Sequence, residues 1–154
     1  MLQLTCRSWI AIIALLSAAP AIAGGANFAQ LTLALGFDRA AAVVIGHTGG
    51  SYSLSSIANR DSRNNTCIGY GDTTPDHILV LKDNFPKLTL QVDSGGKDTT
   101  LVVRGQGKIR CGDDTGDNKD ASIQDKNWQA GTYEIWVGSM EPGKHWNYRL
   151  TAQQ

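Results

Sequence analysis

Apolar residues recur at every second position along much of the chain. In residues 87–93 Leu88, Leu90 and Val92 fall on one face, and polar residues separate them. Successive side chains of a β-strand point to opposite faces of the sheet, so strict alternation indicates a strand with one buried face. No segment shows the three-to-four-residue spacing that an amphipathic helix needs. The pattern therefore favours an all-β fold.

Residues 132–137 alternate in the same way, with Trp136 on the face opposite to Tyr133, Ile135 and Val137. Other strand candidates, rich in β-branched and aromatic residues, are Leu31–Leu35, Val43–Ile45, Tyr52–Ser56, His77–Leu81, Thr99–Arg104 and Trp146–Leu150. Turn residues such as Gly49-Gly50, Gly105-Gln106-Gly107 and Glu141-Pro142-Gly143 separate these runs. About eight or nine short strands at this spacing predict an antiparallel β-sandwich, jelly-roll-like in its connections.

The first 23 residues have the pattern of a secretory signal peptide. Arg7 precedes the apolar stretch Trp9–Ala19, and Ala21-Ile22-Ala23 forms a cleavage box of small residues. A buried N-terminal helix or an uncleaved anchor is the alternative. We expect cleavage, a secreted or periplasmic protein, and a single domain over residues 24–154. No later apolar run approaches membrane-spanning length, so no membrane span is expected in the mature chain.

Cleavage at this position removes Cys6 and leaves two cysteines, Cys67 and Cys111. Disulfides form and persist in oxidising compartments, so two cysteines in an exported domain most simply pair with each other. A pair of buried free thiols is the alternative. The bridge would pin one end of the polar stretch 55–76, which is either a binding loop or a tolerated insertion.

Charge and composition exclude several classes of protein. The whole chain carries 14 basic and 14 acidic residues, and this balance argues against nucleic-acid binding, which needs a basic surface. With 42% hydrophobic residues the chain is too apolar to be disordered. We therefore expect a folded domain with no nucleic-acid partner.

Acidic residues concentrate in one short stretch. Asp113, Asp114, Asp117 and Asp120 lie within eight positions, and carboxylates in a flexible loop are ligands that Ca²⁺ prefers. The spacing does not match an EF-hand loop. The alternative is a solvated turn in which the side chains cap their own backbone. Calcium is the one cofactor that the sequence suggests.

Two tryptophans are candidate ligand-binding residues. Trp128 precedes the Ala130-Gly131 turn, and Trp136 faces away from the apolar side of its strand. Exposed aromatic rings stack on sugars or anchor protein partners. The alternative is that both rings pack under a second sheet or a covering loop.

Catalytic motifs are scarce. The chain has no G-x-S-x-G motif, its three histidines show no metal-ligand spacing, and nothing nominates a pair of catalytic carboxylates. Ser94, in the turn Asp93-Ser94-Gly95-Gly96, is the one serine in a setting that resembles a nucleophile's. A hydrolase, a hydrolase inhibitor and a structural surface protein remain alternatives to a non-enzymatic binding module.

The second half of the chain resembles the bacterial pre-peptidase C-terminal domain family. The resemblance covers roughly residues 78–153 and rests on motifs that follow one another: Leu88-Thr89-Leu90-Gln91-Val92-Asp93-Ser94, Asp98-Thr99-Thr100-Leu101-Val102-Val103, Cys111-Gly112-Asp113-Asp114, Ala130-Gly131-Thr132-Tyr133-Glu134-Ile135-Trp136-Val137-Gly138 and Tyr148-Arg149-Leu150-Thr151. It implies a small, exported, jelly-roll-like β-sandwich of the kind usually attached to secreted proteases or other hydrolases. Related modules of secreted collagenases bind collagen and calcium.

Two consequences follow for this chain. Asp98 and Asp113-Asp114 match the acidic positions of the family, which adds Asp98 to the calcium candidates. The sequence departs from the family because the residues before the match lie outside the pattern, and we expect a stand-alone module without an attached protease domain. We therefore expect a non-enzymatic binding or accessory module for a protein, such as a secreted protease, or for a polysaccharide.

Overall fold

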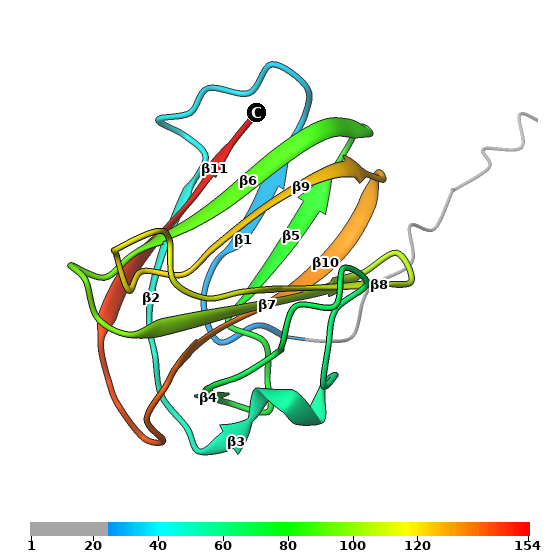
Figure 1. The fold of residues 1–154 in the computed structure, drawn as a ribbon. Helices are drawn as coiled ribbons and strands as arrows, with labels where there is room; N and C mark the ends of the chain where they lie inside the picture. Colours follow the sequence, from blue (N-terminus) through cyan, green and yellow to red (C-terminus); the bar gives the residue numbers. More distant parts are fainter. Residues whose placement is uncertain (1–24) are drawn as a thin grey trace, which may run out of the picture.

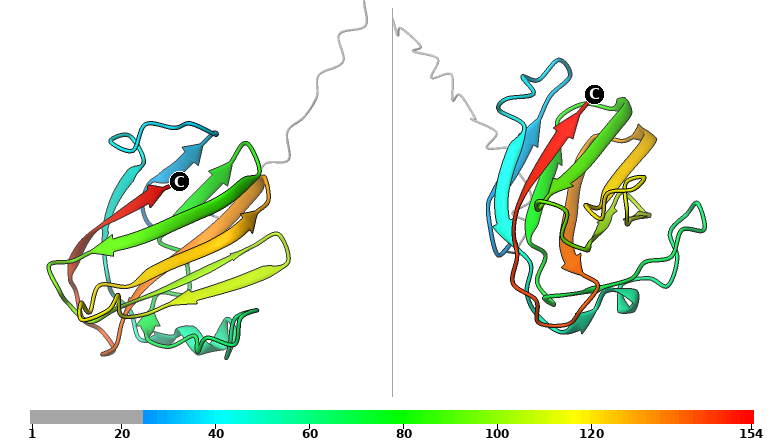
Figure 2. Two further views of the ribbon diagram at one scale, coloured as in Figure 1. Left: turned by 45° about the horizontal axis from the view of Figure 1, so that its top comes forward. Right: turned by 60° about the vertical axis from the view of Figure 1, so that its left-hand side comes forward.

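The computed structural model describes residues 25–154, so the predicted signal peptide lies outside the described residues. Two β-sheets pack face to face (Figures 1 and 2), and the β-sandwich predicted from the sequence is confirmed. Within the described range, no helix has the length and apolar character needed to cross a membrane.

Eleven strands form within residues 25–154, two more than the upper expectation of nine. They are β1 Gln30–Leu33, β2 Val43–His47, β3 Tyr52–Ser53, β4 Tyr70–Gly71, β5 His77–Leu81, β6 Phe85–Asp93, β7 Thr99–Gly105, β8 Lys108–Gly112, β9 Ser122–Trp128, β10 Gly131–Ser139 and β11 Asn147–Gln153. A 3₁₀ turn at Leu54–Ser56 replaces the second half of the strand predicted at Tyr52–Ser56. The patterns of β4, β8 and β9 were too short or too polar for the sequence to predict these strands.

The larger sheet has seven strands. Its main path is β1-β5-β10-β4-β3, with β7 pairing β10 and β8 pairing β7. β1 runs parallel to β5, with Leu31 opposite Leu79. This parallel pair departs from the antiparallel arrangement expected from the sequence, because alternation shows which face of a strand is buried and not which neighbour it pairs with.

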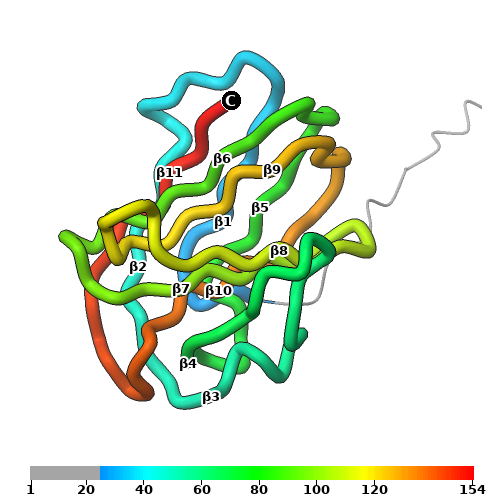
Figure 3. The backbone as a smooth tube through the Cα atoms, in the orientation of Figure 1, coloured from blue at the N-terminus to red at the C-terminus, as the bar shows by residue number. Residues whose placement is uncertain are grey.

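The smaller sheet has the order β2-β11-β6-β9, and all its pairings are antiparallel. Figure 3 follows the chain to β11, which lies between β2 and β6. The main core lies between the two sheets, where Leu88, Leu90, Ile135 and Leu150 are fully buried. Residues from both halves of the chain contribute to it.

A second, smaller core lies on the other face of the larger sheet. There Leu54, Val102, Trp136 and the two cysteines pack together. The segment that carries β3, the 3₁₀ turn and the loop to β4 covers this face (Figure 2). The polar stretch predicted as a surface loop is thus the cover of a buried apolar cluster.

Candidate functional site

Cys67 and Cys111 form a disulfide, which confirms the predicted pair. Their Cα atoms lie 5.2 Å apart across a sequence separation of 44 residues, and both residues are buried. Cys111 lies in β8 and Cys67 in the loop before β4, so the bridge fastens this loop to the edge of the larger sheet. Such a bridge is typical of oxidising compartments.

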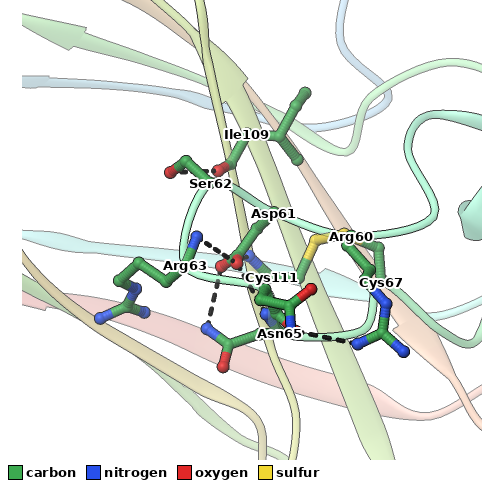
Figure 4. Close-up of a disulfide and its surroundings, with 9 residues drawn as sticks. Arg60, Asp61, Ser62, Arg63, Asn65, Cys67, Ile109 and Cys111 are labelled. Atoms are coloured by element: carbon green, nitrogen blue, oxygen red, sulfur yellow. Dashed lines mark hydrogen bonds between the residues drawn. A yellow bond between two sulfur atoms is a disulfide. The ribbon is translucent and has the colours of Figure 1, made fainter.

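Asp61 organises the loop beside the disulfide (Figure 4). Its carboxylate accepts hydrogen bonds from the backbone N–H groups of Arg63 and Asn65, both at 2.8 Å, and from Cys111 N–H at 3.2 Å. The Asn65 side chain donates a further bond at 2.9 Å. Burial raises the pKa of Asp61, but these hydrogen bonds outweigh it, so the pKa lies below its usual value. The loop therefore has a fixed conformation rather than that of a loose insertion.

A polar hollow of about 550 Å³ lies between this loop and the acidic turn. Its walls are Arg63, Asn64, Asn65, Thr66, Ile68, Cys111, Gly112, Asp113, Asp114 and Ser122. The two stretches that the sequence nominated separately, the polar loop and the acidic turn, thus line one site. We call it the disulfide hollow.

Asp113 and Asp114, which line the disulfide hollow, belong to a group of three carboxylates. Asp98, Asp113 and Asp114 each offer an oxygen, and these oxygens lie within 4.8 Å of one another. Burial and the charges of Asp114 and Asp98 raise the pKa of Asp113, and its Oδ1 atom is buried without a hydrogen-bond partner. The Lys119 ammonium contacts Asp98 Oδ2 at 2.9 Å. The group has the donor chemistry of a hard-cation site.

The structure does not bring the other two predicted calcium ligands into this group. Asp120 is buried and accepts bonds from the backbone N–H groups of Ser94 at 2.8 Å and Gly96 at 3.2 Å. Its hydrogen bonds lower its pKa although burial raises it, and its role is to hold the turn between β6 and β7. Asp117 is exposed in the tight turn closed by the Thr115–Asn118 bridge.

Both tryptophans are buried, so the expectation of an aromatic ligand surface was wrong. Trp128 has no exposed surface, and its ring lies 3.9 Å from the Arg110 guanidinium and edge-on to Tyr133 at 5.3 Å. Trp136 does face away from the main core, as predicted, but only 2% of it is exposed. The disulfide-fastened segment, which contributes Leu54, covers it.

Ser94 does not occupy a nucleophile's setting. Its hydroxyl contacts Asp120 and the Lys97 carbonyl, and its hydrogen-bond partners within residues 25–154 include no histidine. His77 is buried between Ala29 O and the Tyr148 hydroxyl, at 2.9 Å from each, so its contacts are structural.

One pair of residues escaped the sequence analysis. The rings of His47 and His145 stack with centroids 3.7 Å apart, although 98 positions separate them in the sequence. They meet because β2 pairs with β11, with Asn147 opposite His47. Local spacing carries no signal for such a contact; only the strand pairing does.

Comparison with known proteins gives a match among solved structures. No family model matches the chain, and no curated protein matches it. Among solved structures, the fold is similar to the pre-peptidase C-terminal domain of a collagenase from Bacillus anthracis. The identity is 12%, the TM-score is 0.45, and the alignment covers 80% of this chain and 94% of that one.

Proposed function

We propose that this protein is an exported, non-enzymatic binding or accessory module for a protein or polysaccharide ligand, with calcium as a stabilising cofactor. The observation that carries the proposal is the disulfide hollow, which a fixed polar loop lines together with Asp113 and Asp114, two carboxylates that converge with Asp98. A secreted protease is one protein partner that fits an accessory role. The proposal includes no catalytic residue and no nucleic-acid partner.

The loop side of the disulfide hollow supports ligand recognition. Arg63 donates to Gln124 O at 2.9 Å and lies 3.7 Å from Asp125, so its side chain is held at the rim. Asn64 and Thr66 are exposed beside it. Amide, hydroxyl and guanidinium groups on a fixed loop can bind sugar hydroxyls or peptide groups without a large ordering cost.

The acidic side supports calcium. Ca²⁺ takes six to eight oxygen ligands, which carboxylates, backbone carbonyls and water supply. An ion held by Asp98, Asp113 and Asp114 would give the buried Asp113 Oδ1 a partner and remove the repulsion that raises the pKa of Asp113. It would also tie the β6–β7 turn to the end of β8, next to the disulfide.

The calcium part is tested by thermal unfolding of the mature chain with millimolar Ca²⁺ and with chelator. A ligand present at 100 times its Kd adds about 2.7 kcal/mol to the stability, so we expect a clear rise in Tm. The double variant Asp113→Asn/Asp114→Asn should lose the rise, whereas Asp117→Asn, outside the group, should keep it. An identical Tm in calcium and chelator would refute the calcium site.

The ligand part is tested on an array of glycans and extracellular matrix proteins. We expect a bound ligand whose affinity falls when Asn64→Ala and Thr66→Ala change the loop side of the disulfide hollow. The matched control is Thr32→Ala, an exposed residue of β1 away from the hollow. A ligand that binds the loop variants as tightly as the wild type would contradict this location.

A further inference from the structure

The strand β2 has one side without a strand partner. It lies at the edge of the four-stranded sheet and pairs only with β11 within the described residues. Ala152 N–H donates to Ala42 O at 3.0 Å, and in an antiparallel pair such bonds recur at every second residue. Val43, Ile45 and His47 therefore direct their backbone N–H and C=O groups away from β11. This free row is a template for another strand.

The edge at β2 lacks the protection that the opposite edge of the same sheet carries. β2 contains no charged residue other than a histidine and no proline, and Ile45 is 69% exposed. β9, at the other edge, carries Asp125 and Lys126, and the Arg63 side chain donates to Gln124 O. Natural proteins use charges of this kind to prevent edge pairing, so the contrast marks β2 as the edge left open.

A mainly apolar groove of about 610 Å³ lies over β2, the start of β11 and the end of β6. Phe28, Ile45, Gly46 and Tyr148 line it together with the polar residues His47, Asp93, Asn147 and Arg149. A Cβ atom on Gly46 would lie 2.9 Å from the Phe28 ring and 2.5 Å from the Tyr148 hydroxyl oxygen, so glycine lets the Phe28 ring reach the strand. A strand added at β2 would lie next to the apolar side chains of Phe28 and Ile45.

The groove leads into a second hollow, of about 430 Å³, because Phe28 and His47 line both. Two carboxylates, Asp72 and Asp76, lie in its wall. Asp76 is only 4% exposed, and burial raises its pKa to about 6. Within residues 25–154 no lysine or arginine forms an ion pair with either carboxylate. The hollow thus presents one buried carboxylate, Asp76, and one exposed carboxylate, Asp72, next to aromatic rings, a setting that suits an ammonium or guanidinium group.

We propose that β2 binds an extended peptide as an added strand, and that a lysine or arginine side chain of this peptide enters the hollow at Asp72 and Asp76. The inference rests on the proposed function, because it assumes that the protein binds other proteins. It adds a second binding surface, separate from the disulfide hollow. A second copy of this chain fits less well, because its β2 has no lysine or arginine to place in the hollow. The occupant is therefore a basic peptide in extended conformation.

The test measures binding of the blocked peptide acetyl-Thr-Val-Arg-Val-Thr-Val-amide by calorimetry at pH 7.5. Two matched peptides accompany it: one with Glu in place of Arg, and one with N-methyl groups at alternate residues, which removes one row of backbone donors. We expect the Arg peptide to bind at least tenfold more tightly than either. The protein variants are Ile45→Lys, which places a charge on the exposed edge, and Asp72→Asn/Asp76→Asn.

Ile45→Lys should abolish binding, whereas Leu35→Lys, an exposed apolar residue outside the groove, should leave it intact. Asp72→Asn/Asp76→Asn should remove the preference for Arg over Glu, and Asp83→Asn should keep it. Circular dichroism confirms that each variant is folded. Equal binding of the three peptides, no binding at millimolar peptide, or a wild-type dimer that Ile45→Lys dissociates would each overturn the inference. None of these outcomes bears on the disulfide hollow, whose calcium and ligand tests use other residues.

Discussion

Asp76 carries a buried carboxyl group whose ionisation destabilises the folded protein. Its Oδ2 atom accepts the Val137 N–H at 2.7 Å, and its other oxygen has only Asn27, at 3.5 Å. Burial raises its pKa from 3.8 to about 6. The folded state therefore keeps the Asp76 proton over a pH range in which the unfolded chain has lost it, and the contribution of Asp76 to stability falls as pH rises from about 4 through 6.

The magnitude follows from the two pKa values. Each pKa unit equals about 1.4 kcal/mol, so the full cost of ionising Asp76 is about 3 kcal/mol. Asp76→Asn keeps an acceptor for Val137 N–H and cannot ionise. We expect the free energy of unfolding of the variant, relative to the wild type, to increase by about 2 kcal/mol between pH 4 and pH 7.5.

Urea denaturation of both proteins across this pH range measures the difference. Comparing the two cancels the contributions of other groups, such as His77, whose pKa burial lowers and which therefore adds stability as pH rises toward 6.5. Asp83→Asn, beyond the other end of β5, is the matched control and should show a constant difference. The reasoning would be refuted if the difference in unfolding free energy between Asp76→Asn and the wild type did not change with pH.

Three further predictions concern stability. Replacing Cys67 and Cys111 by alanine should cost about 4 kcal/mol by the chain-entropy model for a loop of this length, and a reducing agent should lower the Tm of the wild type alone; an unchanged Tm would contradict a stabilising bridge. Ile135→Asp places a charge in the main core, where Ile135 has no exposed surface, and should unfold the domain, whereas Ile135→Val should cost about 1 kcal/mol; a cooperative melt of the aspartate variant would show that the core tolerates the charge. Arg110→Ala should cost about 3 kcal/mol because it removes a buried ion pair with Asp125 at 2.7 Å and the packing under the Trp128 ring. Arg110→Met, which restores the packing, should cost less. Equal losses of unfolding free energy for Arg110→Ala and Arg110→Met in urea denaturation would show that the packing contributes little.

The sequence predicts the strands whose pattern is set by burial. β5 forms over His77–Leu81 as expected, and β7 extends the expected range by one residue, because nearly all of their side chains are buried. β9 was missed because only Ile123 and Trp128 of its seven residues are buried. An edge strand of this kind leaves too weak an alternation for the sequence to show.

The local sequence pattern does not show which strands pair or which segment covers a given face of a sheet. Alternation placed Trp136 on the correct face, but it could not show that a polar segment with few apolar residues would cover that face. The same segment brings Asn64 into the wall of the disulfide hollow, which Asp113 also lines. Contacts of this kind depend on which strands pair and on the Cys67–Cys111 bridge. The spacing of residues along the chain could therefore indicate candidate site residues, but it could not show that they lie together.

The position of β11 limits when the domain can fold during synthesis. It is the last of the eleven strands to leave the ribosome, yet it separates β2 from β6 in the middle of its sheet. Until Leu150 arrives, neither Val44 nor Val92 has its partner. A nascent chain that stops before residue 147 therefore holds two unjoined strand edges, so the sandwich closes only after synthesis has passed its final strand.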